Sequence, residues 1–216
     1  MLVLAGLLLA LVVLTVLVAA GSLTRIDQFS VDHLMPWLRP LSQGHNGWSG
    51  FYRPFALHSS TWSKVFDLWT YPCSILISSL VVIWAAIVLW QRYGPVVALA
   101  PAVAWVIGNG IEVIGKGTIT RPPLYREADG IPVHIDAFDD SFPSGHMMRG
   151  VIVAFAIGLM FTRSWKWAAV WAVLVGPALV LQSAHTVMDV VGGALVGCIL
   201  LVVMLSLLRT EARVER

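Results

Sequence analysis

Long apolar runs dominate the pattern of hydrophobic positions along the chain, and the polar residues gather in the stretches between them. Six runs have the length and apolarity of membrane-spanning helices: residues 2–20, 71–90, 95–115, 145–161, 167–181 and 190–208. An α-helix needs about 20 mostly apolar residues to cross a hydrocarbon core of ~30 Å. The pattern therefore predicts an all-α, polytopic membrane protein in which residues 1–216 form a single six-transmembrane-helix bundle.

The composition agrees with a lipid environment. Of the 216 residues, 58% are hydrophobic and only 12% are charged, whereas soluble proteins carry roughly a quarter charged residues. Because this number of charges is too small to cover a water-facing surface, we expect the membrane bilayer to be the solvent of this chain. The net charge of +2 is too small to indicate a nucleic-acid partner.

The lengths of the connections and their charges predict the orientation. Connections 91–94 and 162–166 are short, while connections 21–70 and 116–144 are long and lie at the other end of the bundle. If both termini share one side, that side carries an excess of basic over acidic residues: Arg92, Arg163, Lys166, Arg209, Arg213 and Arg216 against Glu211 and Glu215. Such an excess marks the cytoplasmic face. We expect cytoplasmic termini, with both long loops on the outer or periplasmic side of the cell (inner or plasma) membrane.

The first long loop is rich in aromatic residues, which concentrate at membrane–water interfaces. An amphipathic helix is predicted by two capping residues followed by apolar residues at helical spacing: Ser60 and Thr61, then Trp62, Val65, Phe66 and Trp69. We expect interfacial helices in this loop. Their role is open between an interfacial anchor, which the pattern favours, and a lateral gate for a lipid substrate.

Three polar clusters fall at helix ends that the predicted topology places on the outer side. The first lies between Lys116 and Arg121, the second is Ser144-Gly145-His146, and the third lies between His185 and Asp189. Polar groups at the ends of membrane helices are costly, so they require a functional or structural reason. Their common location on one side predicts a shared site.

Two of these clusters have the chemistry of a phosphate site. Lys116 and Arg121 supply positive charge, and an arginine fork matches two phosphate oxygens. Ser144 stands where a helix N-cap belongs, and Gly145 allows a ligand to approach the backbone. The free N–H groups of a helix N-terminus bind anions. Glu112, four residues before Lys116, is expected to pair with it on the helix.

The histidines supply candidate catalytic groups. His185 and Asp189 are four residues apart and would share a helix face, so the carboxylate can hold one ring nitrogen while the other attacks. His146 is positioned to act as a general acid for the leaving oxygen. Together with the cations, this set suits phosphoryl transfer through a phosphohistidine.

No cofactor is expected. The acidic residues of the second loop, with one histidine, could bind a divalent ion: His134, Asp136, Asp139 and Asp140. Their spacing matches no established ligand pattern, so a solvated acidic loop is the favoured interpretation.

The order Lys…Arg-Pro, then Pro-Ser-Gly-His, then His-x-x-x-Asp followed by Val-Val-Gly-Gly-Ala resembles the phosphatidic acid phosphatase type 2 superfamily, in its bacterial six-span form, within residues 116–197. The resemblance implies that His185 is the nucleophile, Asp189 its orienting carboxylate and His146 the general acid. It also implies phosphate binding by four residues: Lys116, Arg121, Ser144 and Gly145.

The sequence departs from the family pattern in two motifs. The family spacing is Lys-x6-Arg-Pro, but four residues separate Lys116 from Arg121 here. The family pattern Ser-Arg-x5-His has Ala178 and Leu179 in place of Ser-Arg. Arg149 follows His146 by three residues and would share its helix face. We therefore predict that Arg149 replaces the missing arginine as a phosphate ligand, the alternative being that it extends to lipid headgroups.

The resemblance predicts metal-independent hydrolysis of a lipid phosphate or diphosphate. Candidate substrates are an isoprenoid carrier diphosphate, phosphatidylglycerol phosphate and phosphatidic acid. Two alternatives stay open: a lipid-to-lipid phosphotransferase, and a degenerate lipid-phosphate-binding or transport protein without turnover. The missing arginine supports the second alternative, whereas His146, His185 and Asp189 oppose it.

Overall fold

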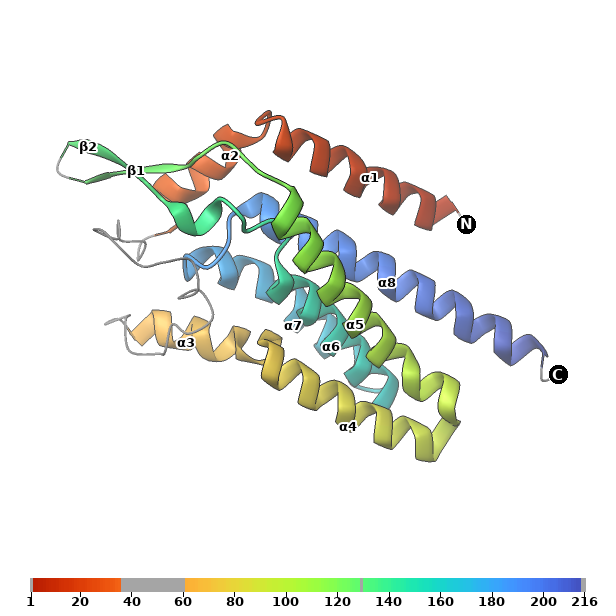
Figure 1. Ribbon diagram of the computed structural model, residues 1–216. Coiled ribbons are helices and arrows are strands. Elements are labelled where there is room, and N and C mark those ends of the chain that lie inside the picture. Colours follow the sequence, from red (N-terminus) through yellow and green to blue (C-terminus); the bar gives the residue numbers. More distant parts are fainter. Residues whose placement is uncertain (1, 36–60, 129, 215–216) are drawn as a thin grey trace.

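The computed structural model describes residues 2–35, 61–128 and 130–214, and six long helices form its body (Figure 1). They are α1 (Leu2–Ala19), α4 (Ile75–Tyr93), α5 (Pro95–Thr118), α6 (Gly145–Met160), α7 (Trp165–Leu181) and α8 (Val187–Val214). Every apolar run predicted to be helical is a helix, and the ends differ from the predicted ones by a few residues. A single residue, Gly94 at φ +85°, separates α4 from α5.

Among the described residues, four helices are long and apolar enough to cross a membrane: α1, α4, α5 and, over Val187–Arg209, α8. Helices α6 and α7 are apolar but shorter, at 16 and 17 residues. The chain is therefore a multi-pass membrane protein, and the count of six spans stays a prediction.

Smaller elements gather at one end of the bundle. They are α2 (Thr24–Phe29), the π-helix η1 (Ser30–Leu34), α3 (Thr61–Thr70), the 3-10 helices η4 (Tyr71–Cys73) and η5 (Asp136–Phe138), and the antiparallel strands β1 (Tyr125–Ala128) and β2 (Ile131–His134). The strands are a departure from the purely helical fold that we predicted. The sequence Asp129-Gly130 is a hairpin signal, and Gly130 adopts φ +77° between the strands.

The amphipathic helix predicted in the first loop exists as α3. It packs against α7, where the indole N–H of Trp171 donates to the backbone carbonyl of Trp69 at 3.3 Å. The predicted cap at Ser60 and the other aromatic residues between positions 36 and 60 lie outside the described residues. The interfacial position of α3 stays a prediction.

The two termini lie at the same end of the bundle, and the hairpin, α2 and α3 lie at the opposite end (Figure 1). This arrangement agrees with the predicted placement of both long connections on one side. It also places the end of α5 and the starts of α6 and α8 together, at the end away from the termini.

Helix α6 lies at the centre of the bundle and contacts α4, α5, α7 and α8. Its buried residues Met148, Ile152 and Phe155 pack against apolar side chains of α4, α5 and α8. Two glycines of α8 allow a close approach: a Cβ on Gly193 would overlap the backbone carbonyl of Ser144, and one on Gly197 would come within 2.7 Å of Val151. Small residues allow membrane helices to pack closely in this way.

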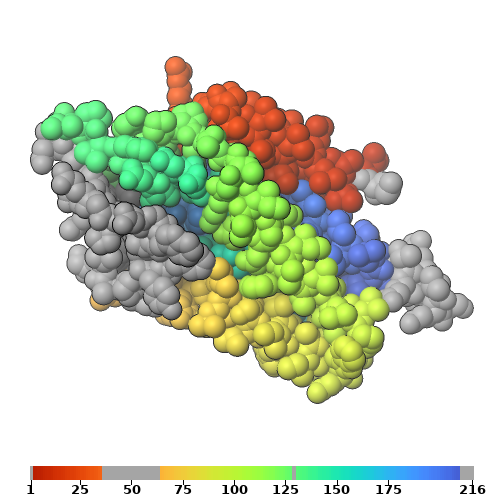
Figure 2. Space-filling model, viewed as in Figure 1, coloured from red at the N-terminus to blue at the C-terminus, as the bar shows by residue number. Residues whose placement is uncertain are grey.

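Helix α8 also packs on its other side against α1 and α5. In the space-filling view, α8 reaches the surface between these two helices (Figure 2). The packing of α8 against both α5 and α6 fixes the three helix ends that carry the polar clusters.

Candidate active site

The three polar clusters predicted from the sequence meet at one end of the bundle. The ring centroids of His146 and His185 lie 5.7 Å apart. The N–H of Ser144 donates to the backbone carbonyl of Asp189 at 2.9 Å, which joins the start of α6 to the start of α8. Lys116, at the end of α5, reaches the same region through Glu112 and Arg149.

The N-terminus of α6 is built as predicted. The hydroxyl of Ser144 accepts the N–H of Met147 at 3.2 Å, so Ser144 is the N-cap. The first N–H groups of the helix, at Gly145 and His146, have no acceptor within their own helix. A Cβ on Gly145 would overlap the carboxylate of Glu112, so only glycine permits an anionic group to lie against the backbone here.

His185 is not part of α8, and the prediction that it shares a helix face with Asp189 was wrong. The helix begins at Val187 because Thr186 and Asp189 cap it reciprocally. The N–H of Asp189 donates to Thr186 Oγ1 at 3.4 Å, and the N–H of Thr186 donates to Asp189 Oδ2 at 3.0 Å.

This capping turn nevertheless brings the two predicted catalytic groups together. The distance from His185 Nδ1 to Asp189 Oδ2 is 3.7 Å, longer than a hydrogen bond, and Nδ1 has no hydrogen-bond partner among the described residues. Catalytic hydrogen bonds are often long before substrate binds. The arrangement leaves the opposite ring nitrogen, Nε2, as the one directed away from the carboxylate.

Asp189 is fully buried, and both of its carboxylate oxygens accept hydrogen bonds. Its Oδ1 accepts from Arg121 Nη1 at 2.7 Å, and its Oδ2 accepts from the hydroxyl of Ser141 at 2.7 Å. Arg121 also forms an ion pair with Asp27 of α2 through Nη2. The guanidinium predicted as a phosphate ligand is therefore held by two carboxylates.

Asp27 links α2 to the candidate site. Its Oδ1 accepts the N–H of Met188, in the first turn of α8, at 3.0 Å. Burial raises the pKa of Asp27 above its usual range, while the guanidinium of Arg121 acts in the opposite direction. Asp27 could not be predicted from the sequence because it lies 94 positions before Arg121. Ser141 and Thr186 are also absent from the sequence prediction, although the Thr-x-x-Asp capping pattern at Thr186 is readable.

Lys116 and Arg149 share the carboxylate of Glu112. Lys116 Nζ lies 2.7 Å from Oε1, which confirms the predicted pairing, and Arg149 Nη1 lies 2.6 Å from Oε2. Arg149 is only 2% exposed, so its guanidinium lies inside the protein and does not extend to lipid headgroups. It also donates to the carbonyl of Cys73 and to Asn109 Oδ1, both at 2.8 Å.

The first motif has a shorter spacing than the family pattern, but its lysine, Lys116, still points toward the candidate site. Counted back from Arg121, the family lysine would fall on Ile114, which is 65% exposed on the outer surface of α5. Lys116 instead directs its ammonium to Glu112, beside the start of α6. The lysine at position 116 is therefore the one that faces the candidate site.

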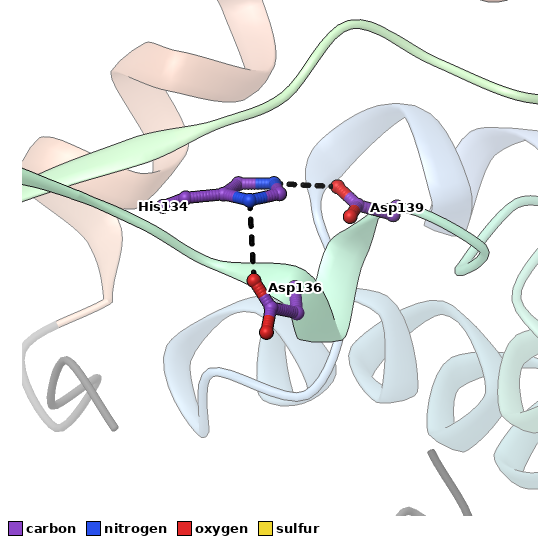
Figure 3. Close-up of side chains that lie close together, drawn as sticks. All are labelled: His134, Asp136 and Asp139. Atoms are coloured by element: carbon purple, nitrogen blue, oxygen red, sulfur yellow. Dashed lines mark hydrogen bonds and ion pairs between the residues drawn. The ribbon is translucent and has the colours of Figure 1, made fainter. Parts of the chain in front are cut away.

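The acidic loop contains a small cluster outside this site (Figure 3). His134 Nδ1 lies 3.1 Å from Asp136 Oδ1, and His134 Nε2 lies 2.9 Å from Asp139 Oδ1. The carboxylates thus face different nitrogens of one ring, whereas a metal ion binds one nitrogen of an imidazole. Asp136 is 89% exposed. Each ring nitrogen of His134 thus has its own carboxylate partner, and we assign the cluster no catalytic role.

A family model described as the PAP2 superfamily matches residues 96–213, more than half of the chain and all three polar clusters. The chain belongs to the PAP2 superfamily. The resemblance predicted from the motifs is thereby confirmed. No curated protein matches the chain.

A solved structure shares the PAP2 fold. The chain is similar to a transmembrane PAP2-type phosphatidylglycerolphosphate phosphatase from Bacillus subtilis, with a TM-score of 0.65, 19% sequence identity and 96% of each chain covered. At this identity the likeness establishes the fold. Family and fold together support membrane phosphatase activity in general.

Proposed function

We propose that this PAP2 protein hydrolyses a lipid phosphate or lipid diphosphate through a phosphohistidine on His185, without a metal ion. The observation that carries the proposal is the pairing of His146 and His185, 5.7 Å apart, at the N-terminus of α6. A phosphoryl group bound between the two rings has a nucleophile on one side and a proton donor on the other.

The phosphate ligands in this proposal are Lys116, Arg149 and the free N–H groups at Gly145 and His146. Ser144 contributes as the N-cap of α6, because its own N–H donates to the carbonyl of Asp189. The two cations and the helix N-terminus favour an anion and stabilise the charge of the transferring phosphoryl group. Because these groups already supply positive charge, no metal is required by the chemistry. Gly145 lets the phosphate approach the backbone without meeting a side chain.

In the first step, His185 Nε2 attacks phosphorus as the bond from phosphorus to the lipid oxygen breaks. His146 donates a proton to that oxygen, and the lipid leaves as an alcohol, or as a monophosphate if the substrate is a diphosphate. In the second step, water attacks the phosphohistidine while His146 accepts a proton from the water. Inorganic phosphate leaves and both histidines return to their starting states.

Asp189 acts on His185 by accepting its Nδ1–H, which selects the tautomer with a free Nε2. We assign Arg121 to this carboxylate rather than to phosphate, because its two terminal nitrogens contact Asp189 and Asp27. The arginine, with the hydroxyl of Ser141, keeps Asp189 in place. Arg121 and Asp27 are thus positioning residues.

Arg149 is the proposed substitute for the arginine that the family carries at the position of Leu179. Leu179 is fully buried in one cluster with Cys73, and the carbonyl of Cys73 accepts a hydrogen bond from Arg149. The guanidinium of Arg149, on α6, therefore lies beside Cys73. An arginine at position 179, on α7, would lie beside the same residue. This proximity supports the replacement.

The substrate candidates are an isoprenoid carrier diphosphate, phosphatidylglycerol phosphate and phosphatidic acid. The excess of basic residues at the end that holds the termini supports a site facing the outer or periplasmic side. Two alternative functions use the same phosphate site: transfer of the phosphoryl group to a second lipid, and binding without turnover. The replacement of the family arginine by Leu179 favours the latter.

Phosphate release from these three lipids, measured with full-length protein in detergent and EDTA, tests the proposal. We expect release from at least one lipid, inhibition by vanadate and no release by His185→Ala. Release that stops in EDTA and returns with one added ion contradicts the metal-free mechanism. Phosphate that appears on a second lipid rather than in solution identifies a transferase, and binding without release identifies a binding protein.

A further inference from the structure

Glu112 lies where the phosphate ligands converge. Its two carboxylate oxygens are divided between the two cations, with Oε1 at 2.7 Å from Lys116 Nζ and Oε2 at 2.6 Å from Arg149 Nη1. The side chain of Glu112 is 11% exposed, so this contact is largely shielded from water. An internal anion thus contacts both side-chain cations that the proposed mechanism assigns to phosphate.

The same carboxylate also lies on the N-terminus of α6. All three atoms of its carboxylate group, Cδ, Oε1 and Oε2, would overlap a Cβ on Gly145, so the group lies directly against the first residue of the helix. A helix N-terminus favours an anion at this place. The phosphate position is expected to lie beside cations, a glycine and a helix N-terminus. The carboxylate of Glu112 lies beside all three.

We propose that the Glu112 carboxylate occupies the phosphate position in the substrate-free protein and is displaced when substrate binds. This inference rests on the proposed function in that it takes the start of α6 as the phosphate site. A phosphate and a carboxylate at the same place repel each other, so substrate binding expels the carboxylate. The carboxylate is carried by a flexible side chain and can rotate away without movement of α5.

A simple structural role for Glu112 explains less. Arg149 is already oriented by two other acceptors, the carbonyl of Cys73 and Asn109 Oδ1, both at 2.8 Å. The guanidinium would therefore keep its place after Glu112 is displaced. What Glu112 supplies is charge: without it, a 2% exposed arginine would be a buried cation without a counter-ion whenever substrate is absent.

A substrate must therefore compete with the Glu112 carboxylate for the two cations. A ligand must bind the cations more strongly than the internal carboxylate does, which favours phosphomonoesters and diphosphates, with two or more negative charges, over the single negative charge of a phosphodiester lipid. Glu112 is thus a specificity-determining residue that keeps abundant phosphodiester lipids out of the site.

The experiment measures binding of inorganic phosphate to full-length protein in detergent, by 31P NMR titration, for wild type, Glu112→Gln and Glu127→Gln. Glu127 is exposed on β1, away from the site, so its variant controls for the change in net charge. We expect Glu112→Gln to bind phosphate at least about tenfold more tightly, because the substitution removes a like charge from the site. Glu127→Gln should match wild type.

The sign of the change decides the inference. Unchanged or weaker phosphate binding by Glu112→Gln would mean that Glu112 orients the cations, and the displacement is then wrong while the phosphate site stands. Failure of all three proteins to bind phosphate contradicts the site and the inference together. The experiment measures phosphate binding and not hydrolysis. A protein that binds phosphate but does not hydrolyse lipids would therefore contradict the proposed function, but not the displacement of Glu112. If Glu112→Gln does not fold, Glu112→Asp, which withdraws the carboxylate by one methylene, should show a smaller tightening.

Discussion

The N–H of Ser144 donates to the backbone carbonyl of Asp189 at 2.9 Å. Ser144 precedes His146 by two residues, and Asp189 follows His185 by four, so this one backbone bond joins the two segments that carry the histidines. A backbone contact does not depend on side-chain rotamers. It fixes the spacing of the two backbone segments before any substrate is bound.

Asp27→Asn should weaken the support of the site from α2. The substitution leaves Arg121 with one carboxylate partner instead of two, and breaking a buried ion pair costs about 3–5 kcal/mol. We expect a lower midpoint of thermal unfolding in detergent and a fall in kcat with little change in KM, since Asp27 acts through Arg121 and Asp189. The exposed Asp32 offers a matched control as Asp32→Asn. An unchanged kcat in Asp27→Asn protein that unfolds earlier would show that Asp27 only stabilises the fold.

His146→Ala should impair substrates according to their leaving groups. A general acid contributes ~10²–10⁴-fold, and most of this is needed when the leaving oxygen is strongly basic. We expect a large loss with a lipid alcohol as leaving group and a small loss with a nitrophenyl phosphate, whose leaving group needs no proton. Equal losses for the two substrates, measured as kcat/KM, would contradict the general-acid role.

Arg149→Ala should remove most of the activity, and Leu179→Arg added to it should restore part. The two positions share the surroundings of Cys73, which makes a rescue from α7 geometrically reasonable. Because Arg149 is buried, its loss also leaves Glu112 with one cation, Lys116, instead of two; the same pair of variants in a Glu112→Gln background separates this effect from catalysis. Arg163→Ala, in the exposed α6–α7 turn, is the control. Near-normal turnover by Arg149→Ala would exclude Arg149 from phosphate binding.

The helices of the fold could be predicted closely from the sequence because the length of an apolar run is a local property. The N-cap at Ser144 and the Lys116–Glu112 pair are local in the same sense, since their partners lie three and four residues away. The β-hairpin departs from the all-α prediction because its strands have only four residues each and leave no long pattern in the sequence. Helix α8 begins before its apolar run because the capping pair of Thr186 and Asp189, and not apolarity, sets its start.

The parts of the site that escaped prediction depend on tertiary contacts. Nothing near Asp27 in the sequence points to Arg121, because the pair forms only when α2 packs against the start of α8. The contact of Glu112 with Gly145 and Arg149 likewise requires α5 and α6 to be placed side by side. The sequence could therefore predict that the three polar clusters meet at one end of the bundle, but not that Glu112 would lie against Gly145 and Arg149.

Trapping the phosphoenzyme tests the central claim most directly. Full-length protein mixed with a 32P-labelled lipid phosphate and quenched in alkali, where phosphohistidine survives, should carry label on the peptide that contains His185. His185→Ala should carry none, and Asp189→Asn should form it ~10²–10⁴-fold more slowly, by analogy with the orienting carboxylate of hydrolase triads. His134→Ala, in the exposed loop cluster, should label as wild type does. Phosphate release at the normal rate by His185→Ala, or label on another residue, would contradict the account.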